Sequence, residues 1–261
     1  MKNFNNTYGP WALITGASDG IGREFAHQLA DKGLNIILVA RNEANLNELS
    51  EKLINLYQIN TMVISLDLSK EDSNKTLINN IKTYDIGLFI LAAGFGSTGL
   101  FFKNNLLNEV NMLQLNCQTV LTQCFLFGQF LESRGNGGII LFSSLLAFQG
   151  TPYSANYAAT KAYVQSLGEG LAPEFKSKGV DLLIVAPGPI NTGFGKRAKM
   201  MMKQSLSPDV VANQSLNALG NRTTIRPGWL SKLLGWSLAL APRWIAVKII
   251  GNIVKGMSPA N

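Results

Sequence analysis

A short apolar run that leads into a glycine-rich turn and a helical pattern, residues 11–33, constrains this fold more than any other feature. The run Trp11–Thr15 has the length of a buried strand. Gly16 opens a turn that contains two further glycines, Gly20 and Gly22. At such a strand–turn–helix junction, backbone N–H groups and the helix dipole face a bound phosphate. The segment therefore predicts an α/β fold with a dinucleotide-binding site.

Apolar runs and helical patterns continue to alternate along the chain. Five further runs are apolar enough for buried parallel strands: Asn35–Ala40, Thr61–Leu66, Ile86–Leu91, Ile139–Phe142 and Val180–Ala186. With 261 residues, of which 46% are hydrophobic and 15% charged, the chain suits one compact enzyme domain. The alternation predicts a mostly parallel sheet covered by helices.

Ser144, Tyr157 and Lys161 carry groups that can act together on a carbonyl. Tyr157 and Lys161 lie four residues apart in an Ala-rich helical run, so they share one helix face. Ser144 ends a predicted strand and can face that helix across a loop. We expect the lysine charge to lower the tyrosine pKa from about 10 towards neutrality. Tyr157 could then protonate a carbonyl oxygen to which Ser144 donates a hydrogen bond.

A chance Tyr and Lys on a packing helix is the alternative, and the pair alone does not exclude it. The Ser, Tyr-x-x-x-Lys arrangement and the T-G-x-x-x-G-x-G spacing of Thr15–Gly22 together resemble the short-chain dehydrogenase/reductase family. Within this family the chain is similar to an NADP-preferring, bacterial-type reductase group. The pattern and the resemblance predict one doubly wound parallel sheet, a Rossmann fold, as a single domain over residues 1–261. Its expected strand order is roughly 3-2-1-4-5-6, with a seventh strand near Thr223–Arg226.

The resemblance also implies roles for individual residues. Asn116, in a helix expected from about Leu106 to Leu131, would complete a tetrad with Ser144, Tyr157 and Lys161 by linking the lysine to water. A bond to nearby backbone is the alternative for its amide. Where the family usually has Asn-Asn-Ala-Gly, this chain has Leu91–Gly94, which keeps the glycine and lacks the bracing asparagines. The residues expected around the coenzyme are Gly16, Ser18, Gly20, Ile21, Gly22, Arg41, Asp67, Leu68, Ala93, Gly94, Tyr157, Lys161, Pro187, Gly188, Ile190 and Thr192.

The end of the second predicted strand indicates the coenzyme. An NAD enzyme usually places an acid there to hold the ribose 2′-hydroxyl. Here Arg41 follows Ala40, and a guanidinium suits a 2′-phosphate. We therefore expect NADP(H), although Asp19 stands where many NADP-preferring relatives carry Lys or Arg. A solvated arginine at a helix start is the alternative for Arg41.

The charge is concentrated in the last part of the chain. Residues 1–190 carry 13 Lys or Arg and 15 Asp or Glu, whereas residues 191–261 carry 10 Lys or Arg and a single acid, Asp209. Nucleic acid is the first partner that such a bias suggests. The basic residues are interleaved with Leu, Ile, Val and Trp, however, and no nucleic-acid motif is visible. We therefore expect no nucleic-acid partner.

Two apolar stretches, Trp229–Leu240 and Trp244–Val254, predict basic, apolar helices over about 229–256. Both are too short to span a membrane. We expect them to pack on the parent domain or a second subunit, and weak peripheral contact with a membrane stays open. The segment of about 189–206, with Met200–Met202, is expected to form a loop over the substrate.

The spacing of the cysteines and the first residues of the chain indicate the cellular compartment that we expect. Cys117 and Cys124 lie seven residues apart in a predicted helix, which separates them by about 10 Å along its axis. This is too far for a disulfide, so both predict free thiols in a reducing compartment. No apolar signal segment precedes the first strand. We expect a cytoplasmic protein, and because no metal-ligand cluster is visible, no metal site.

Together these features predict NADP(H)-dependent hydride transfer between the nicotinamide and the carbonyl, or primary or secondary alcohol, of an apolar small molecule. We expect a homo-oligomer. A 3-oxoacyl thioester reductase is the alternative within the enzyme class, because a basic surface would suit an acidic carrier protein. A non-catalytic NADP-binding regulatory protein is the alternative from another class, and the intact tetrad argues against it.

Overall fold

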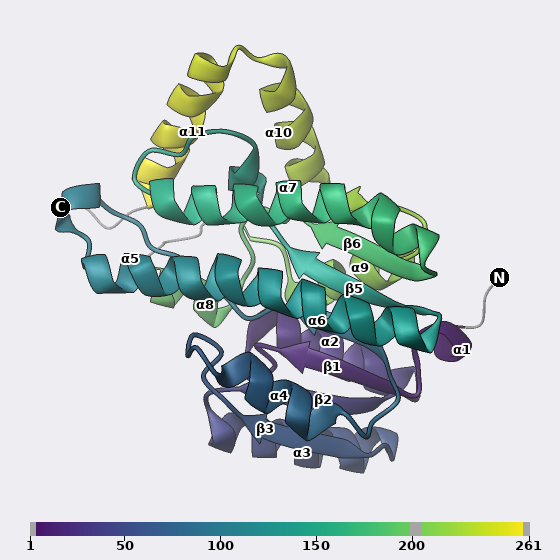
Figure 1. The fold of residues 1–261 in the computed structure, drawn as a ribbon. Coiled ribbons are helices and arrows are strands. Elements are labelled where there is room, and N and C mark those ends of the chain that lie inside the picture. Colours follow the sequence, from purple (N-terminus) through teal and green to yellow (C-terminus); the bar gives the residue numbers. More distant parts are fainter. Residues whose placement is uncertain (1–3, 199–204, 258–261) are drawn as a thin grey trace.

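The computed structural model describes residues 4–198 and 205–257, in which seven strands form one sheet (Figure 1). Their order is β3-β2-β1-β4-β5-β6-β7, and neighbouring strands run parallel. The predicted doubly wound Rossmann sheet is confirmed, with its seventh strand where it was expected. The strands are β1 (Trp11–Thr15), β2 (Asn35–Ala40), β3 (Thr61–Ser65), β4 (Ile86–Leu91), β5 (Gly137–Phe142), β6 (Val180–Val185) and β7 (Thr224–Ile225).

Helices cover both faces of this sheet. One face packs against α2 (Gly20–Asp31), α3 (Glu43–Tyr57) and α9 (Pro208–Ala218). The other packs against α4 (Ser73–Ile81), α6 (Thr119–Arg134) and α7 (Ala155–Ser177). The remaining described α-helices are α1 (Phe4–Tyr8), α5 (Leu106–Leu113), α8 (Gly193–Arg197), α10 (Trp229–Leu240) and α11 (Arg243–Met257).

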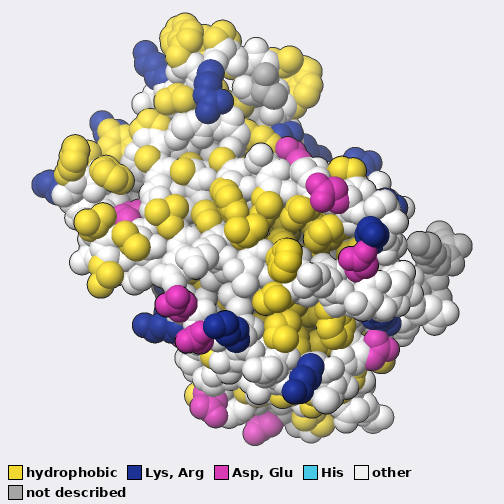
Figure 2. All heavy atoms as spheres, viewed as in Figure 1, with side chains coloured by type: hydrophobic (Ala, Val, Ile, Leu, Met, Phe, Trp, Pro, Cys, Tyr) yellow, Lys and Arg dark blue, Asp and Glu magenta, His cyan; other side chains and the backbone are white. Residues whose placement is uncertain are grey.

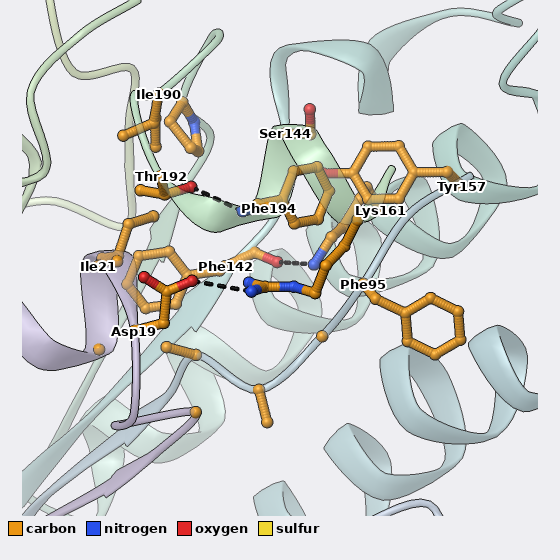
Figure 3. Close-up of a pocket in the computed structure, with 18 of the residues that line it drawn as sticks. Asp19, Ile21, Phe95, Phe142, Ser144, Tyr157, Lys161, Ile190, Thr192 and Phe194 are labelled. Atoms are coloured by element: carbon orange, nitrogen blue, oxygen red, sulfur yellow. Dashed lines mark hydrogen bonds and ion pairs between the residues drawn. The ribbon is translucent and has the colours of Figure 1, made fainter. Parts of the chain in front are cut away.

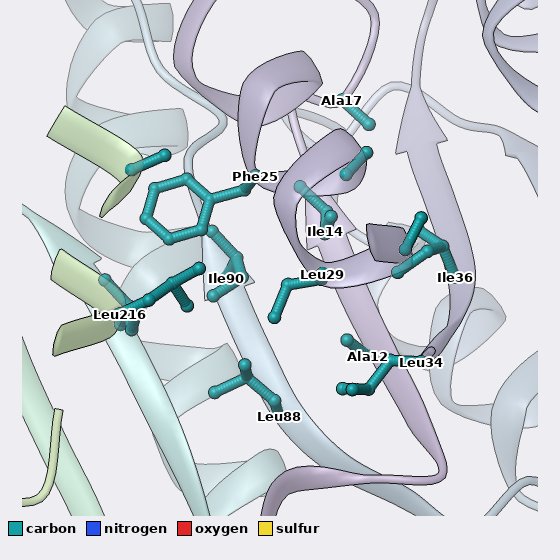
Figure 4. Close-up of a cluster of buried hydrophobic side chains, with 14 of the residues drawn as sticks. Ala12, Ile14, Ala17, Phe25, Leu29, Leu34, Ile36, Leu88, Ile90 and Leu216 are labelled. Atoms are coloured by element: carbon teal, nitrogen blue, oxygen red, sulfur yellow. The ribbon is translucent and has the colours of Figure 1, made fainter. Parts of the chain in front are cut away.

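Successive residues of the central strands enter different hydrophobic layers. Leu13 packs with the α4–α6–α7 side, whereas Ile14 packs with Phe25 and Leu29 of α2 on the other side (Figure 4). Both strand residues are fully buried. Burial on both faces explains why the strands read as continuous apolar runs instead of alternating ones.

The helix expected from Leu106 to Leu131 is interrupted by a π turn at Gln114–Gln118, between α5 and α6. The helical segment also runs on to Arg134 and ends where Gly135 takes a left-handed conformation, with φ of 83°. The π turn contains Asn116, which is buried. Such turns place one extra residue in a helix and are frequent at functional sites.

The helices α10 and α11 form a hairpin that projects from the sheet (Figure 1, yellow). Ile250 and Val254 of α11 pack with Leu238 of α10 and with Leu146, which follows β5. This hairpin is therefore attached next to the loop that carries Ser144. Among the described residues, no helix has the length and hydropathy needed to cross a membrane. Residues 199–204, including Met200–Met202, lie outside the described residues.

A glycine sets the distance between α7 and the sheet. A Cβ atom added to Gly168 would lie 2.5 Å from Cγ1 of Ile184 in β6 and 3.2 Å from Cδ1 of Leu141 in β5. Any side chain at this position would therefore force the helix away from the strands. Since α7 carries Tyr157 and Lys161, its close approach to β5 and β6 positions the candidate site.

We expect Gly168→Ala to destabilise the protein by about 1–3 kcal/mol through overpacking, although alanine is the better helix former. Gly170→Ala, in the same helix, is the matched control because a Cβ there meets no atom within 4 Å. It should be neutral or stabilise by up to about 1 kcal/mol. Urea unfolding midpoints measure both effects. Equal shifts of the same sign would contradict the packing argument.

Candidate active site

A cavity of about 1390 Å³ opens at the carboxyl ends of the strands. It includes the crevice between the ends of β1 and β4, where the chain order of the sheet reverses and dinucleotides bind in such folds. Pockets for one small ligand hold roughly 300–1,000 Å³, so this cavity has room for a coenzyme and a substrate. It is lined by Ser144 and by every residue predicted from the sequence to contact the coenzyme.

The glycine turn forms one end of the cavity and fits a phosphate group. Gly16 has φ of 69°, and a Cβ on it would lie 2.9 Å from the Ala92 carbonyl. Gly20 has φ of 57° and begins α2. Its added Cβ would lie 2.9 Å from the Thr192 side chain. The turn thus excludes side chains at both positions and presents backbone N–H groups to the cavity.

An ion pair closes the outer side of the glycine turn. Nη1 of Arg197 in α8 lies 2.8 Å from Oδ2 of Asp19, and both side chains are partly exposed (Figure 3). Asp19 brings a negative charge close to the expected phosphate site, and Arg197 offsets it. Arg197 therefore offsets the negative charge of Asp19, which would otherwise oppose phosphate binding at this turn. An exposed ion pair of this kind contributes little to the free energy of folding.

Ser144, Tyr157 and Lys161 lie close together on the wall of the same cavity (Figure 3). The Lys161 ammonium donates a hydrogen bond to the Phe142 carbonyl at 2.8 Å. The Ser143 hydroxyl donates to the Lys161 carbonyl at 2.9 Å. These two bonds fasten α7 to the end of β5. Tyr157 and Lys161 are each only 8% exposed.

Burial governs the acidity of both groups. Desolvation raises the pKa of Tyr157 to about 12, and a hydrogen bond with the Ser144 side chain opposes this rise. Desolvation lowers the pKa of Lys161 to about 8. The expectation that the lysine charge brings the tyrosine pKa down is wrong, because the pKa is raised. The ammonium is held at the Phe142 carbonyl, 5.8 Å from the centre of the Tyr157 ring, and desolvation is the largest influence on the tyrosine pKa.

Asn116 lies behind the cavity wall. Its amide nitrogen donates to the Phe95 carbonyl at 2.9 Å and to the Thr160 hydroxyl at 3.1 Å, and its oxygen accepts from the Phe95 N–H at 3.2 Å. A Cβ added to Gly94 would lie 3.0 Å from the Asn116 oxygen and 3.6 Å from the Lys161 ammonium. The Asn116 amide is thus bonded to nearby backbone, which was the alternative to a role in a tetrad. It also lies close to the lysine. Its role in a tetrad stays a prediction.

Two features shape the segment after β4. A hydrogen bond to Thr15 takes the place of the bracing asparagines, and the ring of Phe194 narrows the site. The Thr15 hydroxyl accepts a hydrogen bond from Ala93 N–H at 3.2 Å and so braces the segment after β4. Phe194 places its ring 5.6 Å from that of Tyr157. A Cβ added to Gly96 would come within 2.8 Å of the Phe194 ring and 3.0 Å of the Tyr157 ring. Gly96 is the residue from which this close approach could have been predicted, because only a glycine fits there.

Arg41 and Asp67 line the other extension of the cavity, after β2 and β3. Asp67 accepts hydrogen bonds from the N–H and hydroxyl of Ser69, at 3.1 and 2.7 Å. Burial opposes ionisation of Asp67, but the Ser69 bonds and the charges of Arg41 and Lys70 hold the pKa of its carboxyl below the usual range. The Arg41 side chain is exposed. A cation thus stands where an NAD enzyme usually has an acid.

The segment after β6 reaches both neighbouring loops. The Pro187 carbonyl accepts from Leu145 N–H at 2.9 Å, and Gly188 N–H donates to the Ser231 hydroxyl at 3.1 Å. The remaining wall is mostly apolar and comes partly from the hairpin, with Asn252 of α11 as a polar residue in it. The apolar hairpin residues are Leu230 and Leu234 of α10 and Ile250, Ile253, Val254 and Met257 of α11. Among the described residues, no His, Cys, Asp and Glu side chains gather into a group that could hold a metal ion.

A family model described as short chain dehydrogenase matches residues 10–203. A very-long-chain 3-oxoacyl-CoA reductase-like protein of Arabidopsis thaliana is 33% identical over 244 residues, which cover 90% of this chain and 78% of that protein. A 7β-hydroxysteroid dehydrogenase of Mediterraneibacter gnavus is 26% identical over 232 residues, 86% of this chain and 88% of that protein.

Solved structures show the same fold. A structure from work on 7β-hydroxysteroid dehydrogenase stereoselectivity has a TM-score of 0.87 and 24% identity, covering 95% of this chain and 99% of that one. A short-chain dehydrogenase from Sphingobium yanoikuyae in complex with NADPH has a TM-score of 0.79 and 24% identity, with coverage of 97% and 98%. The matched motifs, the fold and these relatives show that the chain belongs to the short-chain dehydrogenase family of oxidoreductases.

Proposed function

We propose that this protein reduces the carbonyl group of a bulky apolar substrate with NADPH. The observation that carries the proposal is a buried tyrosine and serine that share one cavity with the glycine turn and with an apolar wall. A nicotinamide coenzyme, when bound, supplies hydride. The chain must then supply the binding surface, the proton and a path for apolar substrate.

The lining of the cavity supports a set of coenzyme contacts. We infer that the glycine turn and the start of α2 bind the pyrophosphate. Asp67 and Leu68 would flank the adenine, and Gly94 would leave room near the nicotinamide. Arg41 would hold a 2′-phosphate, because it is a cation on the cavity wall directly after β2. NADP(H) fits this charge better than NAD(H).

Tyr157 is suited to give a proton. With its pKa raised to about 12, the phenol is neutral at pH 7 and carries the proton that a developing alkoxide needs. Ser144 can donate a hydrogen bond to the same oxygen. Below about pH 8 the Lys161 side chain is charged, and it favours the tyrosinate left after proton transfer. Tyr157 is therefore in the protonation state that carbonyl reduction requires.

The hairpin side of the cavity supports an apolar substrate. Leucine, isoleucine, valine and methionine side chains of α10 and α11 line it, so burial of an apolar skeleton there is favourable. The relatives above are named for a hydroxysteroid and for a very-long-chain 3-oxoacyl thioester. Reduction of a long-chain 3-oxoacyl thioester is the second candidate, because the relative with 33% identity is named for it.

Tyr157→Phe tests the proposal, since it removes one oxygen and keeps the ring. We expect the rate of carbonyl reduction to fall by about 10²–10⁴, while the NADPH dissociation constant stays nearly unchanged. Stopped-flow turnover and fluorescence titration of NADPH measure the two quantities. A variant that retains wild-type turnover and folds normally would rule out Tyr157 as the proton donor.

Arg41→Ala tests the coenzyme assignment. A hydrogen bond to a charged group is worth about 1.5–3 kcal/mol, so NADPH should bind roughly ten- to a hundredfold more weakly. NADH lacks the 2′-phosphate and is the matched control, and its affinity should hardly change. Calorimetric titration with both coenzymes makes the comparison. Equal losses would show that Arg41 supports the fold instead of reading the 2′-phosphate.

Lys161→Met tests the effect of burial on the lysine. Below pH 8 the folded protein holds a desolvated cation, so the variant should be more stable at pH 7 by roughly 3 kcal/mol. The pKa is lowered from 10.5 to about 8 on folding. Between about pH 8 and 10.5, Lys161 loses its proton in the folded protein but keeps it in the unfolded chain. The free energy of unfolding of the wild type therefore rises with pH, and the gap in this free energy between Lys161→Met and the wild type closes.

Urea unfolding at pH 7, 8, 9 and 10 measures this gap. Lys82→Met, at an exposed lysine, is the control for replacing a lysine with methionine, and it is measured at the same four pH values. A Lys161→Met gap that stays constant would contradict the lowered pKa.

A further inference from the structure

The helix α10 is apolar on both sides. Trp229, Trp236 and Leu240 are 76%, 65% and 68% exposed and follow helical spacing on one face. The opposite face carries Leu230 and Leu234, which line the cavity. A helix that is hydrophobic all round is normally covered on all sides. Here the outer face has no cover from the described chain.

The outer surface of the hairpin combines these apolar residues with cations. Trp244 of α11 is 70% exposed, and residues 229–257 contain no Asp or Glu. Figure 2 shows hydrophobic and basic side chains together on the hairpin at the top of the molecule. We define the hairpin face as the exposed residues Trp229, Lys232, Leu233, Trp236, Leu240, Arg243, Trp244 and Lys248.

We propose that the hairpin face docks on the surface of an anionic lipid bilayer. Tryptophan is enriched at the boundary between lipid and water, and basic side chains next to it attract anionic headgroups. Lysine and arginine can lay their stems on apolar surface while their charges reach the headgroups. No helix here needs to cross the membrane for this mode of binding.

A second copy of the chain fits this face less well. A symmetric dimer brings the same patch of both subunits together. The cations Lys232, Arg243 and Lys248 of one hairpin would then face a second basic hairpin, with no acid from either hairpin to offset them. Anionic headgroups supply the opposite charge that such an interface lacks. The charge of the hairpin therefore favours lipid over self-association.

Docking has a consequence for substrate entry, which rests on the proposed function. The hairpin that would touch lipid also provides the wall residues Leu230, Leu234 and Ile253. An apolar carbonyl compound dissolved in the bilayer could reach the cavity without crossing bulk water. Lipid binding itself does not depend on this step, so it is tested separately from turnover.

The experiment is flotation of the full-length protein with vesicles of phosphatidylcholine alone or with phosphatidylserine. We expect flotation with the anionic vesicles, weakened by high salt, and little with the neutral ones. Three of the four tryptophans lie in the hairpin, while Trp11 packs against Tyr84. Binding should therefore shift tryptophan emission to the blue, and brominated lipids should quench it.

Matched variants decide whether the hairpin face is responsible. Trp229→Ser/Trp236→Ser should abolish flotation, whereas Phe125→Ser, at an exposed aromatic residue of α6, should not. Lys232→Gln/Lys248→Gln should lower affinity for anionic vesicles roughly 25-fold at low salt, from about 1 kcal/mol per basic residue. Circular dichroism verifies that each variant is folded.

Three results would overturn the proposal. One is the absence of flotation with anionic vesicles at low salt, and another is equal flotation of the folded hairpin variants and the wild type. The third is a wild-type dimer that becomes monomeric in Trp229→Ser/Trp236→Ser, since this would show that a second copy covers the face. None of these readouts requires a substrate, so failure of the proposed reaction would not produce them.

Discussion

The packing of α7 against the ends of β5 and β6 is the constraint on which the candidate site depends. Gly168 lets the helix approach, and the contacts of Lys161 with Phe142 and Ser143 fasten its first turns. The same contacts remove the tyrosine and the lysine from water. Desolvation then raises the pKa of Tyr157 and lowers that of Lys161. Tight packing thus positions the groups and also fixes their charge states.

The coenzyme end of the cavity uses backbone geometry instead of buried charge. Gly16 and Gly20 take left-handed conformations that close the turn to side chains, and the first residues of α2 line the cavity there. Charged side chains also line this part of the cavity, among them Arg41, Asp67 and the Asp19–Arg197 pair. We therefore propose a division of roles, in which the glycine turn binds anionic groups near solvent and Tyr157 holds a protonated phenol away from it.

The strands could be predicted because burial on both faces makes each one a continuous apolar run, and the glycine spacing fixed the turn before α2. The candidate residues were predictable by resemblance, and all except Asn116 line the cavity. Sequence spacing could not reveal the direction of the Tyr157 pKa shift, because it carries no information on desolvation. It also could not reveal the Asp19–Arg197 pair, which joins residues far apart in the chain, or the π turn at Asn116.

The most direct measurement is transfer of deuterium from NADPH labelled at C4 of the nicotinamide to a panel of carbonyl compounds, read by mass spectrometry of the alcohols. The panel holds a bulky ring ketone, a long-chain 3-oxoacyl thioester and a small polar ketone. We predict one deuterium on the carbinol carbon of the ring ketone product and little product from the small ketone. Transfer to the thioester alone would favour the second candidate. Tight NADPH binding without transfer to any of the three would contradict the account and favour a regulatory protein.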